Sequence, residues 1–152
     1  MSADNLIFRK WRLEDCARIA EIEKICFSEP WNEEMIESSF REEHFFGTVV
    51  EIEGKVSAYV GLSVVFDTAD VLLIAVLPEF RQRGIASELL KSSLRAAALI
   101  GAERAMLEVD TENLSAVSCY LKFGFVKIAE RKDYYGRGKN AYIMEKTLLN
   151  NL

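Results

Sequence analysis

The chain has 152 residues, half of them apolar and 28% charged, a composition typical of a soluble globular domain with one core. It has no run of about 18 apolar residues and no basic start followed by an apolar stretch, so we expect neither a membrane span nor a signal peptide, and a cytoplasmic location. A net charge of −5 without a basic stripe argues against nucleic-acid binding.

The cysteine and histidine content argues against a metal site. Cys16, Cys26 and Cys119 are widely spaced and odd in number, and His44 is the one histidine. No CxxC pair or Cys/His ligand spacing is present. We therefore predict unpaired thiols, buried or half-buried in a reducing compartment, and no metal.

The charge is unevenly distributed. Residues 1–76 carry 7 basic and 15 acidic side chains, a net charge of −8, whereas residues 77–152 carry 12 basic and 9 acidic ones, a net charge of +3. The positive half suits an anionic cofactor, and the acidic half could attract a cationic substrate. Solvated helix faces are an equally good explanation.

The expected elements follow from periodicity and from capping residues. Asn32 is a plausible helix N-cap, Glu53-Gly54 marks a hairpin turn, and Gly101 and Gly124 are plausible helix ends. The predicted strands and helices, in chain order, are strand 6–11, helices 13–27 and 33–40, strands 45–52, 55–66 and 68–76, helix 85–100, strand 104–109, helix 115–123, and strands 126–131 and 141–148.

This order, β-α-α-β-β-β-α-β-α-β-β, is not interrupted by a repeat, a low-complexity tract or a linker. It predicts an α+β fold with a mixed sheet and helices on both faces.

The stretch 76–87 has the features of an anion-binding turn. A buried-looking strand leads into it and a helix leads out, with Pro78, a basic triplet at 81–83 and small residues from Gly84 between them. Small residues let successive N–H groups point at one anion, and the helix start adds its unpaired N–H groups. Neither GxGxxG nor a Walker A loop is present, so we predict another kind of diphosphate site.

Residues 81–86, Arg-Gln-Arg-Gly-Ile-Ala, match the signature Q/R-x-x-G-x-G/A, and the chain resembles the GCN5-related N-acetyltransferases (GNAT) over its whole length. Ala86 stands where relatives often have a second glycine. The resemblance implies one GNAT domain over residues 1–152, with a mostly antiparallel central sheet splayed between the fourth and fifth strands. It also implies acetyl-CoA binding by Ile74, Ala75 and Val76 (pantetheine arm) and by Gln82, Arg83, Gly84, Ile85, Ala86 and Ser87 (pyrophosphate).

Glu108 is a candidate base because it is a carboxylate inside an apolar strand. Strand alternation puts Met106 and Glu108 on one face and Leu107 and Val109 on the other. Near the C-terminal end of the strand, Glu108 can be partly buried at a cleft and accept a proton. An edge glutamate paired with a lysine is the alternative, and it is the more common case.

The helix at 115–123 holds a second candidate. Asn113 can cap this helix, and Tyr120 lies near the face shared by Val117 and Leu121. From the residues alone, a core tyrosine with its hydroxyl at the rim is the preferred interpretation.

The pattern N-x-x-A-x-x-x-Y-x-x-x-G-F from Asn113 to Phe125, after a strand ending LEV, is similar to the ribosomal-protein-alanine N-acetyltransferases, the RimI type. That resemblance implies that Glu108 is the general base, Tyr120 the general acid and Asn113 a CoA contact. Transfer is expected to be direct, without an acyl-enzyme. Cys119 should point roughly 100° away from Tyr120 on the helix wheel, so it is not expected to be a nucleophile.

Two further stretches resemble the acceptor-binding parts of that group. Phe27, Pro30 and Trp31 match an F-x-x-P-W junction between the first two helices, although an aromatic staple is equally plausible there. Tyr134 and Tyr135 match an N-Y-Y loop before the last strand, where binding explains two loop tyrosines better than packing does.

The preferred interpretation is an acetyl-CoA-dependent N-alpha-acetyltransferase acting on the N-terminal amine, expected to be alanine, of a basic small-subunit ribosomal protein, and working as a monomer or weak dimer. Acetylation of small amines such as polyamines, amino acids or aminoglycosides is the first alternative. A non-catalytic acyl-CoA-binding regulatory module is the second.

Overall fold

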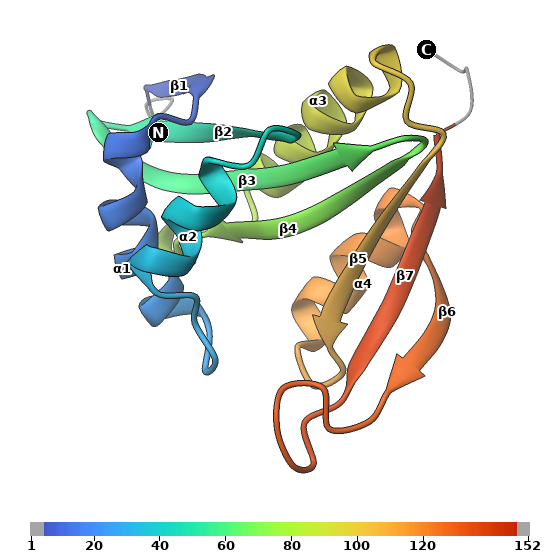
Figure 1. Cartoon of the computed structure of the whole chain (residues 1–152). Helices are drawn as coiled ribbons and strands as arrows, with labels where there is room; N and C mark the ends of the chain where they lie inside the picture. Colours follow the sequence, from blue (N-terminus) through green and yellow to red (C-terminus); the bar gives the residue numbers. More distant parts are fainter. Residues whose placement is uncertain (1–4, 149–152) are drawn as a thin grey trace. The chain divides into compact units, whose positions relative to one another are not determined.

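The computed structural model describes residues 5–148, and its elements follow the predicted order (Figure 1). The strands are β1 (Leu6–Lys10), β2 (Phe45–Ile52), β3 (Lys55–Val65), β4 (Thr68–Val76), β5 (Arg104–Asp110), β6 (Val126–Arg131) and β7 (Ala141–Thr147). The helices are α1 (Cys16–Cys26), α2 (Glu33–Phe40), α3 (Ile85–Leu99) and α4 (Leu114–Phe123), with 3-10 turns η1 (Leu13–Asp15) and η2 (Pro78–Phe80).

The strands form a mixed, mostly antiparallel sheet in the order β1-β2-β3-β4-β5-β7-β6, which confirms the predicted fold class. The fourth and fifth strands, β4 and β5, are parallel. Their ladder joins only Thr68–Asp70 to 104–106, whereas β5 and β7 pair over the whole length of β5. Pairing between the fourth and fifth strands therefore ends early, as expected for strands that separate.

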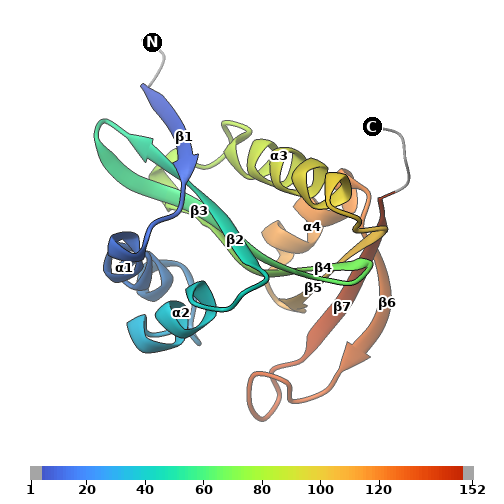
Figure 2. The same cartoon turned by 45° about the horizontal axis from the view of Figure 1, so that its top comes forward.

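The chain forms two compact units, and each has its own packing. The first comprises Met1–Ser63 with Leu72–Ser93, and the second comprises Val64–Val71 with Leu94–Leu152. In the first unit, α1 and α2 lie on one side of β2 and β3, and the start of α3 lies on the other (Figure 2).

Trp11 is the centre of the first core. It is buried, and its ring meets Phe45 and Tyr59 edge-on, with centroids 5.2 and 5.8 Å away. A Cβ added at Gly47 would lie 2.6 Å from the indole, and one at Gly61 would lie 3.0 Å from it. Glycine on both central strands therefore makes room for this large side chain.

The second core lies between β5, β7 and α4. The residues of β5 alternate between buried and exposed, as the predicted strand requires. Tyr120 of α4 is buried and packs edge-on against Phe125 at 5.9 Å. Leu121 was expected on the same face as Tyr120, but it is 45% exposed because one residue is a 100° step around the helix.

The capping predictions are confirmed, and the differences are at element ends. Asn32 Oδ1 accepts a hydrogen bond from Met35 N at 2.8 Å, and Gly124 ends α4 with φ +111°. The first helix begins as the 3-10 turn η1 and stops at Cys26, because Phe27 is extended. The turn η2 was not predicted. No helix within residues 5–148 is long and apolar enough to cross a membrane.

Candidate functional site

The turn before α3 has the backbone geometry expected of an anion cradle. Gln82 and Gly84 have φ of +65° and +80°, so N–H directions alternate through the turn. The first bond of α3 runs from Glu88 N to Gly84 O at 3.0 Å, which leaves the N–H groups of the first helical turn without intrahelical partners. A Cβ at Gly84 would meet no atom within 4 Å. The turn is therefore open, and its geometry fits a diphosphate.

Arg81 belongs to the signature, but its side chain contacts the end of β4 and the end of α1. Arg81 Nε donates to Val76 O at 2.9 Å, and its NH2 lies 3.4 Å from Cys26 Sγ. Burial raises the pKa of the Cys26 thiol, and the Arg81 charge opposes this rise. Arg81 thus ties the turn to the end of β4, while Gln82 and Arg83 remain exposed.

The end of β4 has backbone groups that the β4/β5 ladder does not use. Ile74, Ala75 and Val76 continue beyond Asp70, the last residue of the β4/β5 ladder. Their polar groups along this edge are not used by β5, so they can bond an amide-bearing chain such as pantetheine.

A buried glutamate fixes the junction between α1 and α2. Glu23 is 2% exposed and accepts hydrogen bonds from Tyr59 Oη at 2.6 Å and Trp31 N at 3.0 Å. Burial raises its pKa, and these two bonds oppose the rise. Phe27 and Trp31 pack against the core, and Pro30 is exposed. This packing agrees with the alternative interpretation of an aromatic staple, and it leaves Trp31 partly accessible.

Sequence reasoning missed Glu23. One signal could have found it, because this residue follows the buried Ile22 on the apolar side of α1. A carboxylate there needs partners, and the polar backbone at Trp31 and the Tyr59 hydroxyl supply them.

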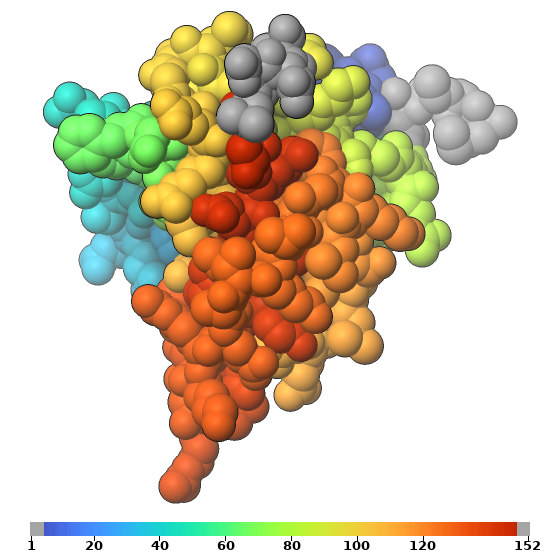
Figure 3. All heavy atoms as spheres, turned by 90° about the vertical axis from the view of Figure 1, so that its right-hand side faces the viewer, coloured from blue at the N-terminus to red at the C-terminus, as the bar shows by residue number. Residues whose placement is uncertain are grey.

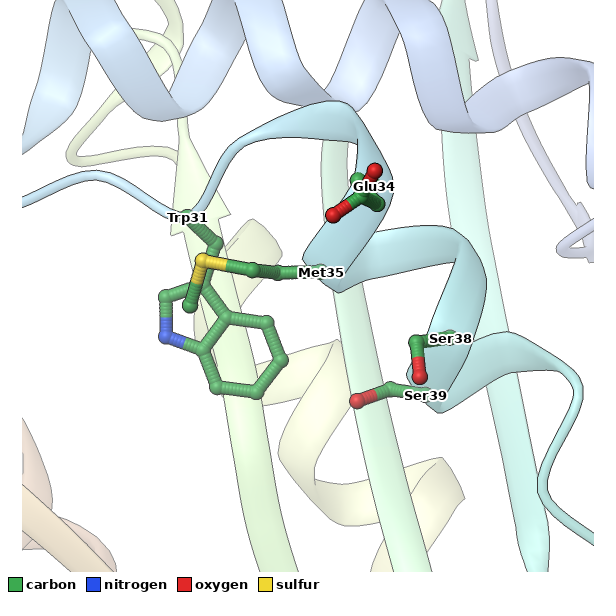
Figure 4. A pocket seen from close by; sticks show the side chains of 5 residues that line it. All are labelled: Trp31, Glu34, Met35, Ser38 and Ser39. Atoms are coloured by element: carbon green, nitrogen blue, oxygen red, sulfur yellow. The ribbon is translucent and has the colours of Figure 1, made fainter.

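A hollow of about 360 Å³ opens beside this junction, between Trp31 and residues of α2 (Figure 4). Its lining combines an aromatic ring, a thioether, a carboxylate and two hydroxyls, contributed by Trp31, Met35, Glu34, Ser38 and Ser39.

In the second unit, Glu108 lies with the two loop tyrosines. The loop between β6 and β7 projects from the surface that Figure 3 shows. Burial and the nearby Glu108 carboxylate raise the pKa of Tyr134. Burial, Tyr134 and Glu108 raise the pKa of Tyr135 to about 12. The rings of Tyr134 and Tyr135 meet edge-on at 4.9 Å.

Glu108 points away from the core of its unit, on the face that strand alternation predicted. It is exposed, so the expected partial burial was wrong. Asp70 is an acidic neighbour of Glu108. Burial and the Glu108 charge raise the pKa of Asp70, whereas the Arg104 charge lowers it. The face is thus suited to a positively charged group.

Tyr120 and Asn113 complete the candidate residues of the second unit. Burial, Cys119 and Tyr135 raise the pKa of Tyr120, so it is a neutral phenol at physiological pH. Asn113 Oδ1 accepts from Ala116 N at 3.2 Å as the cap of α4, which leaves its amide NH2 as a donor.

The thiols are as predicted: Cys16 is buried, Cys26 and Cys119 are half-buried, and all are unpaired. Within residues 5–148, no group of three or more His, Cys, Asp or Glu side chains is arranged to hold a metal ion.

Comparison with known proteins agrees with this geometry. A Bacillus subtilis protein, provisionally named a [ribosomal protein bS18]-alanine N-acetyltransferase, is 34% identical over 92% of this chain and 94% of its own. The crystal structure of the Escherichia coli ribosomal-protein-S18-alanine N-acetyltransferase superposes with a TM-score of 0.85 at 26% identity, covering 97% of this chain and 98% of that one.

The structure of Ard1 from Thermoplasma volcanium gives a TM-score of 0.88 at 29% identity, covering 95% of this chain and 99% of that one. The sequence profile of the acetyltransferase (GNAT) family matches residues 16–125. The chain therefore belongs to the acetyltransferase (GNAT) family and is an N-acetyltransferase.

Proposed function

We propose that this enzyme transfers the acetyl group of acetyl-CoA to the N-terminal amine of a protein, and that this protein is a basic small-subunit ribosomal protein beginning with alanine. The observation that carries the proposal is the 34% identity, over 92% of the chain, to a protein named for that reaction. We further propose that residues 1–152 act as one GNAT domain in the cytoplasm.

The acetyl-CoA site is assigned to the turn before α3, the end of β4 and Asn113. The open left-handed turn at Gly84 and the first N–H groups of α3 support diphosphate binding by Gln82, Arg83, Gly84, Ile85, Ala86 and Ser87. The edge of β4 at Ile74–Val76 supports binding of the pantetheine arm, and Asn113 would donate its amide NH2. Arg81 is excluded from this set because its guanidinium is held by Val76 O.

Glu108 is proposed to take the proton of the acceptor amine. An N-terminal ammonium has a pKa of about 8 and must lose a proton before it can attack. Glu108 is exposed and can reach solvent or the amine, and its charge is close enough to raise the pKa of Tyr134. The charges of Glu108 and Asp70 also favour the approach of a cation.

Tyr120 is proposed to supply the proton that the CoA sulfur needs. The amine nitrogen forms a bond to the acetyl carbon, the carbon–sulfur bond breaks, and the thiolate accepts the phenolic proton. The nitrogen then gives up its second surplus proton, which restores the phenol. The raised pKa of Tyr120 keeps the phenol fully protonated at physiological pH, so a proton is present to be donated. Phe27, Pro30, Trp31, Tyr134 and Tyr135 are proposed to bind the acceptor.

Steady-state kinetics test the proposal. An alanine-starting basic peptide should have a kcat/KM at least about 10²-fold above those of spermidine, free amino acids and an aminoglycoside, because only the peptide fills the whole acceptor site. A higher kcat/KM for a small amine would overturn the choice of substrate. Binding of acetyl-CoA without transfer to any of them would support the non-catalytic alternative.

A further inference from the structure

The hollow beside Trp31 has the chemistry of a subsite for a long cationic side chain. Trp31 and Met35 offer an apolar wall, Glu34 adds a carboxylate, and Ser38 and Ser39 add hydroxyl acceptors (Figure 4). The side chains of lysine and arginine are complementary to this lining. Their aliphatic stems can pack on the apolar wall, and their cationic heads carry several N–H donors for the carboxylate and hydroxyls. A volume of about 360 Å³ admits either side chain.

Hydrogen bonds to buried residues hold the backbone next to the hollow in place. Trp31 N is bonded to the carboxylate of Glu23, which is buried and also bonded to Tyr59 of β3. The backbone at Trp31 is thereby attached to the core, and its side chain packs against the same core while lining the hollow. Met35 is 44% exposed and unbranched, so it can adapt to the side chain that enters.

The surrounding charge favours a cation over a neutral occupant. Residues 29–43 contain six acidic side chains and one basic one. The basic one is Arg41, whose guanidinium lies 3.9 Å from the carboxylate of Glu37. Glu37 is about one helical turn beyond Glu34, the carboxylate of the hollow. No ion-pair partner of Glu34 is found among residues 5–148. Glu34 is therefore available to a ligand.

We propose that this hollow binds a lysine or arginine side chain of the acceptor polypeptide, downstream of the acetylated amine. The inference rests on the proposed function, since it assumes a peptide acceptor. It assigns Glu34 and Trp31 to substrate selection: the indole and Met35 pack on the stem, and Glu34 binds the cationic head.

The test compares alanine-starting peptides that differ at one position at a time, with arginine, norleucine or glutamate at each of the second to sixth positions. At one position, arginine should lower KM roughly threefold to tenfold relative to norleucine, with kcat unchanged, and glutamate should raise it. Glu34→Gln should remove most of the arginine preference, and Glu34→Lys should reverse it in favour of the glutamate peptide.

Glu33→Gln is the matched control, because it removes the same charge from the same helical turn at a residue that does not line the hollow. It should leave the arginine preference intact. Equal KM values for the arginine and norleucine peptides at every position, or equal losses in the Glu33 and Glu34 variants, would overturn the subsite. Failure of the proposed function is distinguishable from failure of the subsite, because in the first case no peptide would be acetylated at all.

Discussion

Two glutamates of this chain are in opposite environments and have different expected roles. Glu23 is buried with two hydrogen-bond donors, whereas the Glu108 side chain is exposed to solvent. The first stabilises a loop, and the second is available to exchange a proton. Burial and partners therefore separate a structural carboxylate from a candidate catalytic one, although the side chains are identical.

Substitution of the proposed acid and base should slow the chemical step. Glu108→Gln and Tyr120→Phe should each lower kcat by roughly 10²–10⁴ and leave the Kd for acetyl-CoA unchanged, because each removes a proton-transfer group without touching the cradle. Single-turnover kinetics and calorimetry measure the two quantities. Glu103→Gln, an exposed glutamate just before β5, is the control and should behave as wild type. Near-normal rates in both variants would refute the assigned roles.

Glu23 should make stability depend on pH. Burial raises its folded-state pKa above the ordinary value of 4.5, so the unfolded chain releases this proton at lower pH than the folded chain does. The contribution of Glu23 to stability is thus complete below pH 4.5 and decreases as the pH rises towards the folded-state pKa. Glu23→Gln cannot ionise and should lack this decrease.

Urea unfolding of both proteins from pH 4 to pH 8 checks this sign. The glutamine side chain of the variant has one acceptor oxygen, so it can keep only one of the two hydrogen bonds that Glu23 accepts. This loss costs about 1 kcal/mol at every pH. The difference in unfolding free energy should nevertheless shift in favour of the variant as the pH rises. A difference that is constant with pH would show that Glu23 ionises alike in both states.

At the scale of elements, the strand–turn–helix of β4, the cradle and α3 depends on a glycine. Gly84 has φ +80° and open space at its Cβ position. Gly84→Ala should raise the KM for acetyl-CoA roughly tenfold, the loss of about one hydrogen bond to a charged group, because the turn must relax or place a methyl group in the diphosphate space. Peptide KM should change little.

Gly54→Ala provides the matched comparison. Gly54 has φ +81° and equally open space, but it lies in the β2–β3 hairpin turn. Both variants should lose about 1 kcal/mol of stability from the left-handed backbone, and only the Gly84 variant should lose acetyl-CoA affinity. An equal effect of the two variants on acetyl-CoA KM would contradict the cradle assignment.

The elements were predictable where local rules dominate. The Asn32 and Asn113 caps, the Glu53-Gly54 turn and the Gly124 helix end are encoded within a few residues. The 3-10 turns and the last residues of strands were missed, because they depend on single bonds to distant segments. The bond from Leu77 N to Ser57 O, just before η2, is one example.

The candidate site was predictable only where a motif carries it. Glu108, Tyr120 and the loop tyrosines follow from sequence patterns, and the structure places them together within the second unit. No sequence motif marks the buried Glu23 with its two hydrogen bonds, or the hollow at Trp31. They arise from contacts of Tyr59 with residues far away in sequence, which a single sequence does not display.

At the scale of the whole molecule, the charge asymmetry should affect acceptor binding. Residues 1–76 carry a net charge of −8, and the acceptor is proposed to be basic. The KM for a basic alanine-starting peptide should therefore rise several-fold between about 50 and 300 mM KCl, as screening weakens the attraction. A neutral peptide of equal length is the control and should show little change. Parallel salt curves for the two peptides would exclude electrostatic attraction.

The identity of the acceptor is the central claim, and one measurement tests it most directly. The purified enzyme is incubated with isotopically labelled acetyl-CoA and an extract of small-subunit ribosomal proteins, and labelled peptides are located by mass spectrometry. We predict label on the α-amine of an alanine-starting ribosomal protein, and its loss with Glu108→Gln. Label confined to lysine side chains or to small amines would contradict the account.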